Sequence, residues 1–115
     1  MTAANRLEQA IAGLRDRFLL GLPARLDVID TALLAAATSD VERGFHSLAG
    51  TAGTYGLPAI AEVAAEGEYA CTSDLDENTP RRLAVLLDRL RLMSQARPRG
   101  NVAVDDSRQE NEWTT

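Results

Sequence analysis

Apolar residues recur at helical spacing along the first third of the chain. From residue 5 to about residue 36, successive apolar positions lie three or four residues apart: Leu7, Ile11, Leu14, Phe18, Leu22, Leu26, Ile29 and Leu33. This spacing places the side chains on one face of an α-helix. Pro23 removes a backbone hydrogen bond and should kink that helix. Because the pattern keeps its phase across Gly21 and Pro23, we expect one long, bent helix; two helices joined at Gly21 are the alternative.

Two shorter amphipathic segments follow. Ser39 and Glu42 have the spacing of a capping box, which predicts the start of a second helix. Its inward positions are Val41, Phe45, Leu48, Ala52 and Tyr55. Gly56-Leu57-Pro58 ends this helix and opens a third, because proline is favoured in the first turn. The inward positions of the third helix are Leu57, Ile60, Ala61, Ala64 and Cys71.

A fourth helix is predicted after a polar, turn-like stretch over residues 72–78. It starts at Thr79-Pro80 and has Leu83, Leu86, Leu87, Leu90 and Met93 inward. From residue 97 the periodicity stops, which predicts a disordered tail over residues 97–115. Strand-like alternation is absent from the sequence. Four amphipathic helices with short connections predict an all-α, antiparallel four-helix bundle over residues 1–96, with a long kinked first helix.

Charge and composition exclude several classes of protein. The net charge of −5 argues against a general nucleic-acid binder, which would carry a basic patch. The only cysteine, Cys71, excludes an internal disulfide and a cysteine-rich metal site. No apolar run approaches the roughly 20 residues of a membrane span, and no signal-peptide pattern is present. We therefore expect a cytoplasmic protein that binds neither nucleic acid nor membrane. A monomer is the expected state, although the sequence leaves self-association open.

The only histidine of the chain, His46, lies on the second predicted helix. On a helical wheel it falls roughly 140° from the centre of the apolar face, so its side chain should face solvent. Its neighbours three, four and seven residues later are Ala49, Gly50 and Gly53. Each helical glycine costs about 0.5–1 kcal/mol relative to alanine. An almost bare surface beside an imidazole would let another protein approach closely; close packing of helices is the alternative reason for the glycines.

Residues 46–56, His-Ser-Leu-Ala-Gly-Thr-Ala-Gly-Thr-Tyr-Gly, resemble the histidine-containing phosphotransfer (HPt) domain. That family carries His-x-Leu-(Lys or Ala)-Gly-(Ser, Ala or Thr)-(Ala or Ser)-x-x-x-Gly on one helix. The segments 14–26, 57–60 and 66–68 are also similar to it, and the resemblance covers roughly residues 5–95. It implies an HPt-like bundle in a two-component phosphorelay.

The resemblance implies that His46 is the phosphoacceptor and that this chain is a carrier rather than an enzyme. The chain has no phosphate-binding loop, so the catalytic parts must come from a partner. A receiver domain would supply the aspartate, a lysine and Mg²⁺, and a hybrid sensor kinase is the other expected partner; this chain itself would bind no cofactor or metal. Arg43, Ala49, Gly50 and Gly53 are the expected docking residues. Ala49 stands where many members have lysine, for which Arg43 is the candidate substitute.

Two other functions are compatible with these residues. One is a helical docking adaptor that never carries phosphate, a degenerate HPt bundle. The other is a hydrolase or transferase that uses His46 with Cys71 or a carboxylate; Cys71 falls on a core face, where cysteines are inert.

In the phosphotransfer function, Glu42 lies one turn before His46 and is the carboxylate expected to have a secondary electrostatic effect on the imidazole.

Overall fold

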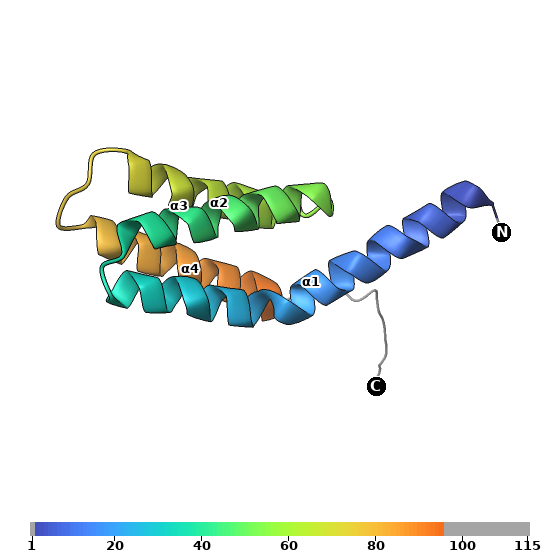
Figure 1. Cartoon of the computed structure of the whole chain (residues 1–115), viewed down its shortest axis with the longest axis horizontal. Coiled ribbons are helices and arrows are strands. Elements are labelled where there is room, and N and C mark those ends of the chain that lie inside the picture. Colours follow the sequence, from blue (N-terminus) through green and yellow to red (C-terminus); the bar gives the residue numbers. More distant parts are fainter. Residues whose placement is uncertain (1, 96–115) are drawn as a thin grey trace, which may run out of the picture.

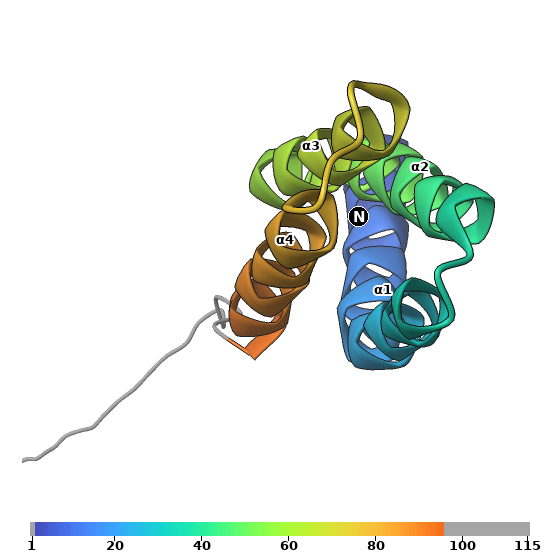
Figure 2. The ribbon, with the colours of Figure 1, turned by 90° about the vertical axis from the view of Figure 1, so that its left-hand side faces the viewer.

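The computed structural model describes residues 2–95 and contains four helices. They are α1 (Ala3–Leu34), α2 (Thr38–Thr54), α3 (Pro58–Thr72) and α4 (Thr79–Gln95). Figures 1 and 2 show α2 and α3 side by side above α1 and α4. Each helix packs against the next, and α4 returns to α1. The predicted all-α bundle is confirmed over the described residues; the tail predicted for residues 97–115 lies outside them, and the domain division there stays a prediction.

Helix α1 runs without interruption through Pro23, so the alternative of two helices joined at Gly21 is wrong. Figure 1 shows the helix changing direction between the part against the bundle and an N-terminal part that projects from it. The buried residues of α1 all belong to the first of these parts: Phe18, Leu19, Leu22, Leu26 and Ile29. Leu7 and Leu14 are 62% and 39% exposed. The apolar stripe predicted on this helix therefore extends beyond the core, because α1 is longer than the helices it packs against.

The core is built around Phe45, whose side chain is completely buried. Gly67 of α3 packs directly against its ring: a Cβ atom at position 67 would lie only 2.5 Å from Phe45 Cδ1. Gly44 plays the same role toward α1, where a Cβ atom would lie 2.6 Å from Ile29 Cγ1. Other buried side chains include Leu83, Leu86, Leu87 and Leu90, as predicted on α4, whereas Met93 is only partly buried. On α3, Val63 and Ala70 are also buried, which the sequence did not single out. Two glycines thus allow α2 to approach both of its neighbours closely.

The ends of α1 and α2 have the same hydrogen-bonded form. After α2, Leu57 N–H donates to Ala52 O (2.9 Å) and Gly56 N–H donates to Gly53 O (3.2 Å), the pattern of a Schellman motif. Gly56 has φ +72°, a left-handed conformation that suits glycine. After α1 the same conformation falls on Ala36, with φ 58°. This alanine is strained, because its Cβ atom disfavours the left-handed region.

The predicted capping box at the start of α2 is wrong. The helix begins at Thr38, with Ala37 at the N-cap position and no side-chain cap. Ala37 N–H donates back to Ala32 O of α1, and Ala37 O accepts from Val41 N–H. Because the turn that ends α1 leads directly into α2, Ser39 already lies within the first helical turn.

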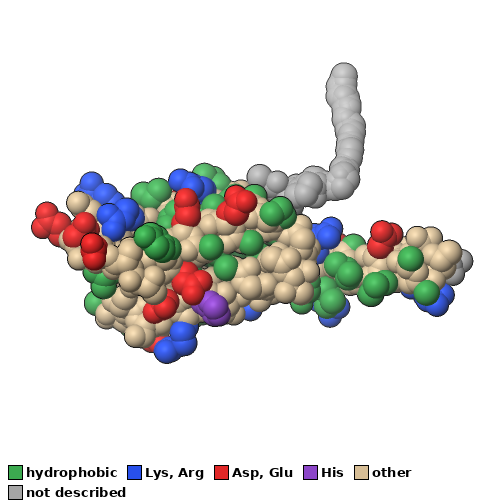
Figure 3. All heavy atoms as spheres, turned by 90° about the horizontal axis from the view of Figure 1, so that it is seen from above, with side chains coloured by type: hydrophobic (Ala, Val, Ile, Leu, Met, Phe, Trp, Pro, Cys, Tyr) green, Lys and Arg blue, Asp and Glu red, His purple; other side chains and the backbone are tan. Residues whose placement is uncertain are grey.

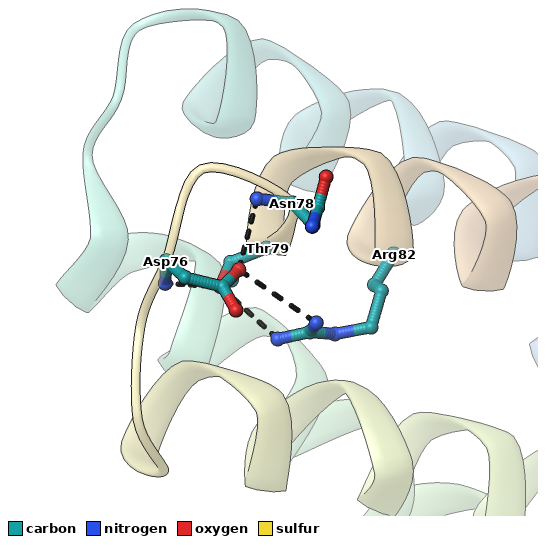
Figure 4. Close-up of polar contacts among 4 residues, drawn as sticks. All are labelled: Asp76, Asn78, Thr79 and Arg82. Atoms are coloured by element: carbon teal, nitrogen blue, oxygen red, sulfur yellow. Dashed lines mark hydrogen bonds and ion pairs between the residues drawn. The ribbon is translucent and has the colours of Figure 1, made fainter.

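The turn between α3 and α4 is held by Asp76 (Figure 4). Its carboxylate accepts a hydrogen bond from Asn78 N–H (2.8 Å), and Asp76 N–H donates to Thr79 Oγ1 (2.9 Å). Arg82 adds a hydrogen bond to Thr79 Oγ1 (3.1 Å) from the next turn of the helix. These contacts satisfy the N–H groups of Asp76 and Asn78 just before α4. The helix begins at Thr79, as predicted.

Candidate functional site

His46 lies on the outer side of α2. Its side chain is 74% exposed, while Phe45 and Leu48 beside it in the sequence are buried. Figure 3 shows the imidazole on the molecular surface, next to acidic side chains. The exposure predicted from the helical wheel is confirmed. Because its neighbours are packed into the core, the backbone that carries His46 is held firmly while the ring faces solvent.

Glu68 of α3 contacts the imidazole. Its Oε2 atom lies 2.8 Å from His46 Nδ1. An ionised carboxylate only accepts hydrogen bonds, so the ring must carry its proton on Nδ1 to make this contact. In the neutral ring this leaves a lone pair on Nε2, the nitrogen that Glu68 does not contact.

The carboxylate expected to act on His46 was Glu42, and the structure places Glu68 in contact with the ring instead. The reason is the packing of α2 on α3. Gly67 lies against Phe45, so the next residue on each helix, Glu68 and His46, face each other across the same contact. The sequence contained one signal for this pair, a glycine beside the glutamate on the third helix. That signal does not reveal which residue of α2 packs against the glycine.

The surface that follows His46 on α2 is nearly bare, and we call Ala49, Gly50 and Gly53 the shelf. Ala49 is partly buried against the core, whereas Gly50 and Gly53 are exposed. A Cβ atom added at Gly50 or Gly53 would meet nothing within 4 Å. Close packing of helices therefore does not explain these two glycines, although it does explain Gly44 and Gly67. The structure confirms that His46 is followed by open space.

Comparison with protein families gives one match. The family model described as the Hpt domain matches residues 13–97. The chain belongs to the Hpt domain family. Hpt domains carry phosphoryl groups on histidine in phosphorelays, exchange them with receiver domains and kinases, and are carriers rather than catalysts. Neither the curated proteins nor the solved structures give a match.

Arg43 lies one turn before His46 on the exposed side of this Hpt bundle. Its side chain is 73% exposed and forms an ion pair with Asp40. An exposed pair of this kind contributes little to stability and is easily exchanged for another partner. Arg43 is therefore accessible to an anionic group, although its charge is partly balanced by Asp40 within the Hpt domain.

Cys71 is buried on α3, as predicted. Burial raises the pKa of its thiol, and the negative charges of Glu42 and Glu68 raise the pKa further. A thiol held in its protonated form is a poor nucleophile, which argues against an enzyme that uses Cys71. Within the described residues 2–95, no group of three or more histidine, cysteine, aspartate or glutamate side chains is arranged to hold a metal ion. None of the helices in this range has the length and apolar character needed to cross a bilayer.

Proposed function

We propose that the protein is a cytoplasmic phosphoryl carrier in which His46 Nε2 receives a phosphoryl group from the aspartyl phosphate of a receiver domain. The observation that carries this proposal is the contact between His46 Nδ1 and Glu68, which points the unprotonated nitrogen away from the bundle. The same histidine is the one that aligns with the family motif. A hybrid sensor kinase is the second partner, at the other end of the relay.

The chemical step needs no proton to leave the histidine. Nε2 attacks the phosphorus of the aspartyl phosphate, the N–P bond forms, and the P–O bond to aspartate breaks to release a carboxylate. The imidazole ring becomes positively charged and keeps its Nδ1 proton. The carboxylate of Glu68, 2.8 Å from Nδ1, stabilises that developing charge. The reverse step returns the phosphoryl group along the same path.

The shelf provides the space that this geometry demands. In-line attack requires the receiver's aspartate and its Mg²⁺ to come within a few ångström of Nε2. A backbone can approach Gly50 and Gly53 because no side chain projects there. Ala49 leaves the same side open, and Arg43 can turn from Asp40 toward the phosphoryl group or the partner. In this proposal Mg²⁺ belongs to the receiver.

The decisive experiment is phosphotransfer from a phosphorylated receiver domain to the purified chain in the presence of Mg²⁺. Wild type should acquire an acid-labile, base-stable phosphate, and His46→Gln should acquire none. Glu42→Gln is the matched control, since the hydrogen bond to the ring comes from Glu68 instead, and it should be labelled like wild type. If no receiver from the source genome labels the wild-type chain, the carrier proposal is wrong. A receiver that binds without transferring phosphate would indicate a docking adaptor.

A further inference from the structure

The N-terminal part of α1 stands apart from the bundle and keeps an apolar stripe. We call the segment from Ala3 to Arg17 the projection. Leu7 and Leu14 are largely exposed on it and Ile11 is partly exposed, and Figure 3 shows hydrophobic side chains along this part of the surface. Removing apolar side chains from water is favourable, so an exposed apolar stripe marks a surface that another chain can cover. The exposed apolar stripe of the projection is therefore suited to pack against another helix.

The spacing of the stripe is that of a coiled-coil seam. Leu7, Ile11, Leu14 and Phe18 alternate in steps of four, three and four residues. This assigns Ile11 and Phe18 to the a positions of a heptad and Leu7 and Leu14 to the d positions. Glu8 and Arg15 then occupy the e positions, which flank the seam.

We propose that the projection pairs in antiparallel orientation with the projection of a second copy of this chain. In that arrangement a positions face d positions, so Ile11 lies opposite Leu14 of the second copy. Leu7 of the second copy lies over Phe18, whose side chain is only 8% exposed because it packs in the bundle core. The e positions face one another, which brings Glu8 of each copy beside Arg15 of the other. The two-fold symmetry makes this opposite-charge pair twice. A parallel pair would place alanines opposite Glu8 and Arg15, so the charge pattern favours the antiparallel arrangement.

The bundle offers a place for the end of the second helix. An open hollow of about 430 Å³ lies where the projection meets the bundle, and it is lined by Leu14, Phe18, Gly21 and Tyr55 together with Arg17, Arg25 and Thr51. Leu14 and Phe18 belong to the seam, and Gly21 occupies the next d position. The space where a Cβ atom of residue 21 would stand is open. In the antiparallel arrangement Leu7 of the second copy points into this hollow. The second chain would then cover the exposed apolar stripe of the projection. The proposal therefore replaces the monomer expected from the sequence with a dimer.

The pairing is small, so we expect a reversible dimer with a dissociation constant on the order of 10–100 µM. Sedimentation equilibrium of the full chain over about 5–300 µM should show the mass rising from 12.4 kDa toward twice that value. Ile11→Glu should weaken association at least about tenfold. Val28→Glu is the matched control, because Val28 is 70% exposed on the part of α1 that packs in the bundle, and it should associate like wild type.

Charge reversal tests the orientation. Glu8→Arg and Arg15→Glu should each weaken the dimer, and the double variant should restore it. Because Arg15 Nε also donates to Tyr55 O (2.9 Å), circular dichroism must show that each variant is folded. A chain that stays monomeric over the whole concentration range, or a dimer that Ile11→Glu leaves intact, would overturn the proposal. Failure of the double variant to restore association would overturn the antiparallel register. None of these outcomes depends on phosphate transfer at His46.

Discussion

Gly67 of α3 lies against the ring of Phe45 of α2, so closely that a Cβ atom at position 67 would be 2.5 Å from Cδ1. This contact fixes how α3 is placed along α2. The residues that follow in each helix, Glu68 and His46, consequently meet at 2.8 Å. A packing contact inside the core therefore sets the geometry of the exposed imidazole.

Alanine substitutions should separate glycines that serve packing from those that leave the surface open. Gly67→Ala should lower the free energy of unfolding by about 1–3 kcal/mol, because the methyl group of the introduced alanine would clash with the buried Phe45 ring. Gly53→Ala should raise it by about 0.5–1 kcal/mol, because alanine is the better helix former and the space is open. Urea unfolding followed by circular dichroism measures both. Equal effects of the two substitutions would contradict this distinction.

A large side chain on the shelf should block the partner without harming the fold. Gly53→Leu should leave the free energy of unfolding equal to or above that of wild type, while the rate of phosphotransfer from a receiver falls about tenfold or more. Ala84→Leu is the control, since Ala84 is exposed on α4 and carries no part of the shelf. Unchanged transfer by Gly53→Leu would show that receivers do not approach across Gly53.

Removing the charge of Glu68 should slow phosphotransfer. We expect Glu68→Gln to reduce the rate about tenfold or more, because the positive charge that develops on the ring loses its carboxylate. Glu66→Gln is the matched control: Glu66 lies on the same helix and pairs with Arg89 instead. Since His46 is the only histidine, ¹⁵N NMR can also report its tautomer directly. Wild type should favour the Nδ1-protonated form, and Glu68→Gln should lose that preference; an unchanged tautomer would contradict the positioning role.

The buried thiol should make stability fall in alkaline solution. Burial and the neighbouring glutamates raise the pKa of Cys71 above its ordinary value, so the folded chain holds the thiol proton more tightly than the unfolded chain does. The stabilisation is present below the ordinary thiol range and is lost as the pH rises through it toward the raised pKa. Unfolding free energies of wild type and Cys71→Ala, measured across that range, should show a downward slope that the variant lacks. Parallel slopes would indicate that Cys71 ionises alike in both states.

Ala36 offers a stabilising substitution. Its φ of 58° is unfavourable for a residue with a Cβ atom, and the position is exposed at the end of α1. Ala36→Gly should raise the free energy of unfolding by about 0.5–1 kcal/mol. The substitution relieves the backbone strain, and the greater conformational entropy of glycine in the unfolded chain offsets part of that gain. Thermal unfolding measures this effect. Ala35→Gly is the control: Ala35 has a negative φ, so this substitution should lower the stability of the protein.

The sequence by itself determined the helices and the direction in which His46 faces. Both depend on the 3.6-residue period of a helix, which is a local property of the chain. The open shelf also followed from spacing alone, since Ala49, Gly50 and Gly53 share one face with His46. The resemblance of this stretch to HPt domains could be seen before any packing was known.

Only the tertiary structure decided which residues of different helices meet. The period of a helix says nothing about how far one helix is displaced along another. The sequence therefore indicated Glu42, one turn before His46, whereas Glu68 makes the contact. Likewise, a stripe of apolar residues does not reveal where the neighbouring helices end, which is why Leu7 and Leu14 are exposed on α1 rather than buried. Both features depend on packing between segments that are distant in the sequence. The close approach of Gly67 to Phe45 brings Glu68 to His46, and the greater length of α1 leaves Leu7 and Leu14 beyond the neighbouring helices.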